Sequence, residues 1–266
     1  MEIYNFGHHI QNQFEFKPSE ELTEEENARL SKLGIIIINV KQSTERREKI
    51  LKWIETLGIT TCIFNAVEGN LLKIHDTSFN PLVKVIEYNN NYFLLDYTRH
   101  FDHEYRGELG SGMIGASLSH ILIYHLLQYQ PYCENFLILE DDASLIHNPN
   151  ITRKYLANLP QTFDMAFLNS ESKWYPIERT DSINDYYSNI KRQFLNASVS
   201  YVISKQGAAK LLAYSRHDVT RPPDDLISNP HVLGVYTVIA SNEFLFGCDY
   251  SFESDAEKFS NQITEI

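Results

Sequence analysis

The feature that most constrains the fold is a short apolar run that ends abruptly in three acids. Residues 136–139 read Phe-Leu-Ile-Leu and are followed by Glu140, Asp141 and Asp142. A run of this length without alternation is typical of a strand that is buried on both faces, as in a parallel sheet. Open α/β sheets bind ligands just beyond the carboxyl ends of such strands. The sequence therefore predicts an α/β protein with a ligand site at the acidic triplet.

The triplet itself has two interpretations. Adjacent carboxylates repel one another, and a hard divalent cation with oxygen ligands relieves that repulsion. If the chain stays extended, Glu140 and Asp142 point to one side and Asp141 to the other. That arrangement suits a metal ion that bridges the phosphates of a nucleotide-sugar. The alternative is an acidic turn after a strand, and the triplet alone does not separate the two.

The preceding segments have the rhythm of a doubly wound sheet. Residues 35–40 predict a buried strand, and apolar residues at helical spacing over 50–57 predict a helix that ends at Gly58. Residues 60–65 predict the next strand. A strand, a helix and a strand over about thirty residues form the βαβ unit of such sheets.

The middle of the chain predicts a hairpin and a long helix. Residues 83–97 are expected to form two strands around an asparagine-rich turn. A helix is expected to follow from Ser111, the expected N-cap. Gly112 and Gly115 near its start allow another backbone or a ligand to approach closely. The remaining predicted elements are a helix over 152–159, a strand over 164–168, a surface loop over 171–192, a strand over 197–203, a helix over 205–212 and a strand over 235–240.

Charge and cysteine usage narrow the class of protein. The net charge of −12 argues against a nucleic-acid or anionic-membrane surface. An acidic protein that binds a diphosphate needs a metal or a few basic residues for local compensation. Three scattered cysteines, Cys62, Cys133 and Cys248, without metal-ligand spacing suit a reducing compartment. The N-terminus has no secretory-signal pattern and no apolar run is long enough to span a membrane, so we expect a cytoplasmic protein, with peripheral membrane association left open.

Four motifs stand in a recognisable order. They are Ile37-Ile-Asn-Val with Glu45-Arg-Arg; Gly112-Met-Ile-Gly-Ala-Ser-Leu-Ser-His120; Leu139-Glu-Asp-Asp142; and Tyr201-Val-Ile-Ser with Gly207-Ala-Ala-Lys-Leu-Leu and Pro223-Asp-Asp225. Together they resemble the family 25 glycosyltransferases, which comprise bacterial lipooligosaccharide sugar transferases and procollagen galactosyltransferases. The resemblance covers roughly residues 35–240. The chain departs from the usual pattern at Val40, where Leu is usual, and at Ala116, where Cys is common.

The resemblance implies the GT-A fold, a Rossmann-like α/β fold with a mostly parallel central sheet and helices on both faces. It also implies a nucleotide-sugar donor, usually UDP-linked, and a divalent cation, Mn²⁺ or Mg²⁺. The implied GT-A domain is 35–250, preceded by an N-terminal extension over 1–34 with a helix, and followed by an acidic tail over 251–266. Residues 69–110 are expected to be an insertion or an acceptor-side segment.

Within this fold the triplet supplies the metal site. We expect Asp142 to be the leading ligand, with Glu140 or Asp141 assisting directly or through water. On this basis we assign Glu140 and Asp142 to the metal and Asp141 to the donor. A bound cation neutralises the charge that develops on a diphosphate leaving group.

Basic and polar residues after the first strand are candidates for donor binding. Arg46 and Arg47 are expected to pair with phosphate oxygens, with a solvated helix face as the alternative. Asn39 and Ser43 lie where a ribose or base binds in this topology. The resemblance also puts Ser119 and His120 near the donor pocket, whereas a buried, hydrogen-bonded histidine is the alternative for His120.

Inversion at the anomeric carbon needs a base that takes the acceptor hydroxyl proton. Asp224 and Asp225 are the candidates, because Pro222 and Pro223 fix the approach of the chain. The alternative is helix N-capping by one of the two.

The leading hypothesis is an inverting, metal-dependent glycosyltransferase that moves a hexose, galactose or glucose, from a UDP-sugar to a hydroxyl of a glycan or protein. A nucleotidyltransferase is a second hypothesis, but residues 41–47 are not the Gly- and Lys-rich phosphate loop that it requires. A third is a catalytically silent sugar- or partner-binding module with the same fold. The acidic triplet and the Pro-Asp-Asp motif argue against the third.

Overall fold

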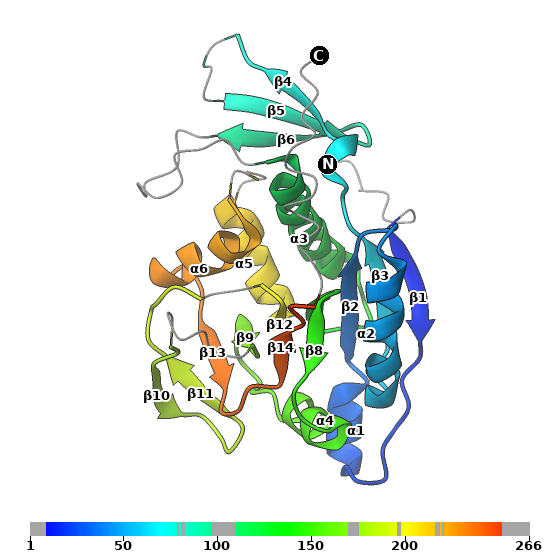
Figure 1. Ribbon diagram of the computed structural model, residues 1–266. Helices are drawn as coiled ribbons and strands as arrows, with labels where there is room; N and C mark the ends of the chain where they lie inside the picture. The colour runs from blue at the N-terminus through cyan, green and yellow to red at the C-terminus, as the bar shows by residue number, and fades with distance from the viewer. Residues whose placement is uncertain are drawn as a thin grey trace.

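A computed structural model describes residues 9–78, 80, 83–96, 110–169, 176–195, 198–215, 219 and 221–251. Within these residues the chain forms one nine-stranded sheet with helices on both faces, and two small sheets (Figure 1). In spatial order the large sheet contains β1 (Ile10–Phe14), β3 (Thr61–Asn65), β2 (Leu33–Asn39), β7 (Asn135–Glu140), β12 (Ser200–Ser204), β9 (Met165–Phe167), β13 (Val238–Ser241), β11 (Tyr187–Ile190) and β10 (Arg179–Ser182). This is the mixed α/β architecture that was expected.

Five central strands of the large sheet, β2, β3, β7, β9 and β13, run in one direction, and β12 among them runs in the opposite direction. β2, β3 and β7 pair in parallel, as do β9 and β13. β12 lies antiparallel between β7 and β9, so all five of those strands run the same way. The buried strand predicted around residues 136–139 is β7, and every residue of β2 is also buried.

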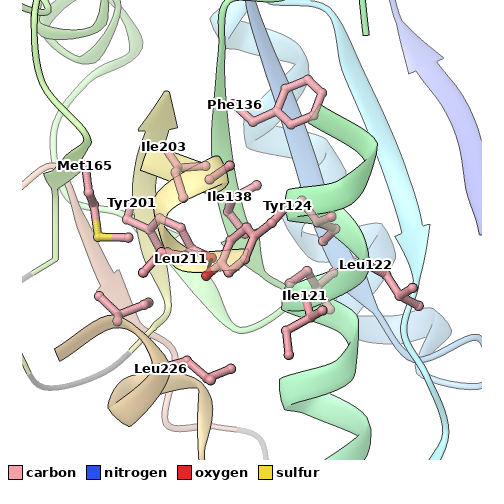
Figure 2. Packing of buried hydrophobic residues seen from close by; sticks show 14 of the residues in the cluster. Ile121, Leu122, Tyr124, Phe136, Ile138, Met165, Tyr201, Ile203, Leu211 and Leu226 are labelled. Atoms are coloured by element: carbon pink, nitrogen blue, oxygen red, sulfur yellow. Dashed lines mark hydrogen bonds between the residues drawn. The ribbon is translucent and has the colours of Figure 1, made fainter. Parts of the chain in front are cut away.

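The helices divide between the two faces of the sheet. They are α1 (Glu24–Leu30), α2 (Thr44–Leu57), α3 (Ser111–Tyr129), α4 (Pro149–Ala157), α5 (Lys205–Ser215) and α6 (Pro223–Val232). Side chains alternate along a strand, so Ile36 and Ile38 of β2 pack in one core with α3, α5 and α6. Ile35 and Ile37 pack in the other with α1, α2 and α4. Figure 2 shows the first core, where side chains of α3 meet those of β12.

The two small sheets lie outside the central one. β4 (Lys73–Asp76), β5 (Val83–Tyr88) and β6 (Asn91–Asp96) form a three-stranded antiparallel sheet, and β8 (Ala143–Leu145) pairs with β14 (Phe246–Cys248). The predicted hairpin is β5–β6, and Asn89 and Asn90 turn it with φ of 48° and 61°. The β8–β14 pair has no counterpart in the sequence prediction.

Residues 9–34 of the expected N-terminal extension are part of the main domain, whereas residues 1–8 lie outside the described residues. β1 pairs antiparallel with β3, so it forms an edge of the large sheet. The helix expected in this segment is α1, which begins with a capping box between Thr23 and Glu26. Leu30 and Leu33 are buried in the core with α2 and α4. The boundary expected at residue 35 therefore separates no independent unit.

Three other predictions need correction. The N-cap of α3 is Gly110, and Ser111 is the first helical residue. Residues 171–192 were expected to be a loop; residues 171–175 lie outside the described residues, but β10 and β11 form a hairpin that extends the sheet beside β13. The segment after Cys248 was also expected to be loosely held, but Asp249 is ion-paired with Lys49. Apart from Ser251, the expected acidic tail lies outside the described residues. Among the described residues, no helix is long and apolar enough to cross a membrane.

Candidate active site

A pocket lies at the carboxyl ends of β2, β3 and β7. After β2 the chain passes through α2 to β3 on one side, while β7 lies on the other side, so the strand order changes direction here. This is the place where open α/β sheets bind ligands. The pocket is lined by Ile38, Val40, Arg46, Ala66, Val67, Glu68, Gly69, Gly112, Ala116, His120, Glu140, Asp141 and Asp142. All three acids of the triplet therefore face one cavity.

Asp141 is held by two side chains from the β2–α2 segment. Asn39 Nδ2 donates to Asp141 Oδ2 over 2.6 Å, and Arg46 Nη1 donates to Asp141 Oδ1 over 2.8 Å. The side chains of Arg46 and Asp141 are each 8% exposed. Asn39 Nδ2 also donates to the carbonyl of Ser43. Asp141 therefore joins the ends of β7 and β2, and its charge is neutralised within the protein.

Asp142 is the acid that lacks such compensation. In the part of the chain that the structure describes, Asp142 Oδ1 is buried and has no hydrogen-bond partner. Burial, together with the charges of Glu140 and Asp141, raises the pKa of Asp142 to about 7. The Cys248 thiol contacts this carboxylate, and burial followed by the Asp142 charge raises the pKa of Cys248 to about 12. A cation beside Asp142 would stabilise its ionised form.

Glu140, unlike Asp142, is held in its ionised form by neighbouring side chains. Burial opposes ionisation, but hydrogen bonding and charge from His120, the Ser198 hydroxyl and the Arg46 charge outweigh it, so the pKa of Glu140 lies below its usual range. His120 Nε2 lies 3.6 Å from Glu140 Oε1, and Ser198 Oγ donates to the same oxygen. The side chain of Glu140 is 30% exposed and lines the pocket.

The backbone of the triplet differs from the expected extended chain. β7 ends at Glu140, and Asp141 and Asp142 form a turn before β8. The turn is fixed because the Asp249 N–H donates to the Asp142 carbonyl over 2.7 Å. The extended-chain geometry was therefore a wrong premise, although all three side chains reach the pocket.

The donor set fits a hard divalent cation only in part. No three His, Cys, Asp or Glu side chains of the described residues gather as a complete metal-binding group. The carboxylate of Asp142 has a buried oxygen without a partner, and Glu140 lines the same cavity. Mg²⁺-like ions are commonly bound through one or two carboxylates together with substrate phosphates and water. The residues present fit that kind of site rather than an all-protein cage.

Four predicted donor-binding residues do not line the pocket, namely Asn39, which binds Asp141 instead, Ser43, Arg47 and Ser119. Ser119 Oγ accepts from the Val67 N–H and donates to the Gly115 carbonyl, each over 2.8 Å, so its hydroxyl is used by the protein backbone. Ser43 is the N-cap of α2. Arg47 is half-buried beside Arg46, outside the residues that line the cavity. Of the two arginines, only Arg46 reaches the site, and there it pairs with Asp141.

Asp224 and Asp225 lie on a neighbouring helix. Both are half-buried in the first turn of α6, where Pro222 is the N-cap, and neither lines the pocket. The Ser117 hydroxyl donates to the Arg221 carbonyl, which holds the start of α6 against α3. Because Ala116 of α3 lines the pocket, the two acids lie on the helix beside its wall.

Several site residues were missed by sequence reasoning. Val67 to Gly69, which follow β3, form one wall of the pocket. A Cβ on Gly115 would lie 2.3 Å from the Val67 carbonyl oxygen, so this wall contacts α3 through a glycine. Gly115 was predicted to allow such an approach, but its partner could not be predicted. Ser198 and Cys248 carry no local signal, because strand pairing far along the chain brings them to the triplet.

Comparison with known proteins decides the family. The sequence model of "Glycosyltransferase family 25 (LPS biosynthesis protein)" matches residues 32–227, which include the whole pocket. The chain belongs to glycosyltransferase family 25.

Similar proteins carry the same assignment. A "Glycosyltransferase 25 family member" of Drosophila melanogaster is 28% identical over 211 residues, covering 76% of this chain and 31% of the relative. "Procollagen galactosyltransferase 2" of Homo sapiens is 24% identical over the same shares of both chains. "Putative glycosyltransferase R655" of Acanthamoeba polyphaga mimivirus is 28% identical over 120 residues, covering 45% of this chain and 31% of the relative. The chain thus spans about a third of the length of these relatives.

Proposed function

We propose that this family 25 chain is a metal-dependent, inverting hexosyltransferase that takes its sugar from a UDP-sugar. The observation that carries the proposal is the uncompensated carboxylate of Asp142 at the carboxyl end of β7. An acidic pocket repels a diphosphate unless a cation lies between them. Asp142, together with Glu140, would hold that cation.

The acids of the triplet then divide between two tasks. Asp142 and Glu140 would present carboxylate oxygens to the cation, and Asp141 would keep Arg46 and the end of β2 in place. When bound, the cation supplies Lewis-acid stabilisation of the diphosphate leaving group. Val40 and the Val67–Gly69 wall would enclose the nucleotide, since both line the cavity beside β2.

The acceptor side is assigned to α6. Asp224 or Asp225 would take the proton from the attacking hydroxyl, because both lie at the N-terminal turn of the helix packed beside α3. The acceptor would be a hydroxyl of a glycan or of a protein. Galactose is the first sugar to test, since one similar protein is named a procollagen galactosyltransferase.

Titration calorimetry with UDP tests the proposal. We expect UDP to bind in the presence of Mn²⁺, and Asp142→Asn to abolish that binding. Glu134→Gln is a matched control, because Glu134 lies at the opposite end of β7, where it pairs with Lys32 on the surface. The control should bind UDP like the wild type. Equally tight UDP binding in EDTA would contradict the assignment of the triplet.

A panel of UDP-sugars identifies the donor and the base. UDP-galactose and UDP-glucose would be followed by slow hydrolysis in the absence of an acceptor. Asp224→Asn and Asp225→Asn should each leave UDP binding intact, while the true base loses at least about 100-fold in transfer rate. If neither variant loses activity, the base is not on α6. UDP binding without turnover of any sugar would instead support a silent binding module.

A further inference from the structure

A buried chain of polar groups connects the hydrophobic core to Glu140. Tyr124 of α3 and Tyr201 of β12 lie in the core between α3 and the sheet, where Figure 2 shows them side by side. Their hydroxyl oxygens are 2.9 Å apart. The Tyr201 hydroxyl lies 2.6 Å from His120 Nδ1, and His120 Nε2 lies 3.6 Å from Glu140 Oε1. The chain ends at an acid that lines the donor pocket.

The protons available on these groups fix the direction of the hydrogen bonds from Tyr124 through Tyr201 to His120. Among the described residues, the fully buried hydroxyl of Tyr124 contacts only the Tyr201 hydroxyl, so its single proton must be donated there. Tyr201 therefore uses its own proton toward His120 Nδ1, the other partner of its hydroxyl. Nδ1 is then an acceptor, and the ring proton of His120 lies on Nε2. The opposite direction would leave one tyrosine proton buried without an acceptor.

The proton on Nε2 points toward the carboxylate. Glu140 Oε1 is the oxygen that lies 3.6 Å from His120 Nε2, and it also accepts a hydrogen bond from the Ser198 hydroxyl. Among the described residues, Oε2 of Glu140 has no hydrogen-bond partner, and the side chain lines the pocket. Both protein donors therefore gather on one oxygen, which leaves the other for a ligand.

We propose that Tyr124 and Tyr201 are positioning residues that fix His120 as the Nε2–H tautomer, so that Glu140 presents its second oxygen to the donor site. The part that concerns Glu140 and the donor rests on the proposed function; the tautomer does not. His120 is also stacked on the Tyr201 ring, with centroids 5.9 Å apart, so one residue sets both the plane and the proton of the imidazole. Partners of this kind, one step behind a ligand, commonly change affinity 10–100-fold when removed.

Nitrogen-15 NMR of the ligand-free protein tests the tautomer directly. At pH 7.5 the wild type should show His120 with a protonated Nε2 and a bare Nδ1. In Tyr201→Phe the Nδ1 acceptor loses its donor, and this single tautomer should be replaced by a mixture. An Nδ1–H tautomer or an imidazolium in the wild type would overturn the proposal, whether or not any variant folds.

Calorimetry with UDP and Mn²⁺ tests the consequence for the site. Tyr201→Phe should weaken binding by about 10-fold. Tyr187→Phe is the matched control: it removes another fully buried tyrosine hydroxyl, bonded to the Tyr155 carbonyl, on the opposite face of the sheet. The control should leave both the His120 tautomer and the UDP affinity unchanged. Equal loss of affinity in both variants would mean a general structural effect and overturn the positioning role.

The two experiments also separate two kinds of failure. If the wild type has the Nε2–H tautomer but does not bind UDP with Mn²⁺, the proposed function fails, while the role of Tyr124 and Tyr201 in fixing the His120 tautomer stands. If the wild type binds UDP with Mn²⁺ and Tyr201→Phe binds equally well, the hydrogen bond from Tyr201 to His120 has no role in the donor site.

Discussion

At the scale of single residues, Asp142 should lower the stability of the ligand-free protein. Its pKa of about 7 in the folded state exceeds the ordinary value of 3.8, so the folded protein binds this proton more tightly than the unfolded chain. The resulting stabilisation is complete below about pH 4 and is lost as the pH rises through about 7. At pH 8 the ionised carboxylate, whose pKa is shifted by about three units, therefore costs on the order of 4 kcal/mol.

Asp142→Asn should consequently raise the free energy of unfolding at pH 8 while it removes UDP binding. The gain should shrink toward pH 4.5, where the folded wild type keeps the proton. Urea denaturation at both pH values measures the free energy of unfolding. The control Glu134→Gln should change neither this free energy nor UDP binding. A variant less stable than the wild type at pH 8 would show that Asp142 is already compensated.

Arg46 should behave in the opposite way, because its charge is needed. Arg46→Met leaves Asp141 buried without its ion pair, and loss of one partner of a buried pair costs about 3–5 kcal/mol. Arg29→Met on α1 is the comparison, since the Arg29–Glu25 pair is largely exposed and should contribute less than about 1 kcal/mol. Urea denaturation distinguishes the two losses. Similar values would mean that Asp141 finds another partner.

The residue types of the site were predictable, but their partners were not. Glu140, Asp141 and Asp142 follow an apolar run, which is a local signal, and all three line the pocket. Their different environments come from distant segments: Arg46 neutralises Asp141, whereas Ser198 and His120 bind Glu140. Spacing along the sequence does not encode such contacts, so the sequence separated the roles of the three acids but could not predict the partners of each.

At the scale of elements, the wall formed by residues 67–69 depends on Gly115 of α3. In Gly115→Ala the new Cβ would lie 2.3 Å from the Val67 carbonyl oxygen, so the backbone must move. We expect a loss of about 1–3 kcal/mol in stability and weaker UDP binding. Gly247→Ala on β14 is the control, because its Cβ would meet its nearest neighbour, Ser144 Oγ, at 3.4 Å. Unchanged urea midpoints for both variants would contradict this close contact.

Elements with strong local signals were predicted and edge strands were missed. β2, α2 and β3 follow from an apolar run, helical spacing and Gly58, whose φ of 57° ends the helix. β1 exposes its three central residues, so it has little apolar pattern and depends on pairing with β3. β10 is similarly exposed, and its hairpin joins the sheet only through β13. Such strands are specified by their neighbours more than by their own residues.

At the scale of the whole molecule, ligand binding should stabilise the entire domain. The pocket joins segments around residues 38–46, 66–69, 112–120 and 140–142, which belong to β2, α2, α3 and β7 and to the turns after β2, β3 and β7. Unfolding separates these segments, so under the proposed function UDP and Mn²⁺ would bind only the folded state. At a ligand concentration 100 times Kd, such binding adds about 2.7 kcal/mol to the free energy of unfolding.

The melting temperature should therefore rise by roughly 5–10 °C with UDP and Mn²⁺ together. Mn²⁺ alone should have a much smaller effect, because the described residues hold no complete metal-binding group and the phosphates of UDP would have to supply the missing ligands. Differential scanning fluorimetry at pH 8 measures these melting temperatures. Without ligand, Asp142→Asn should melt at a higher temperature than the wild type. When UDP and Mn²⁺ are added, its melting temperature should not change. An equal rise with UDP in EDTA would mean that the nucleotide binds without a cation, and the electrostatic argument for the triplet would then fail.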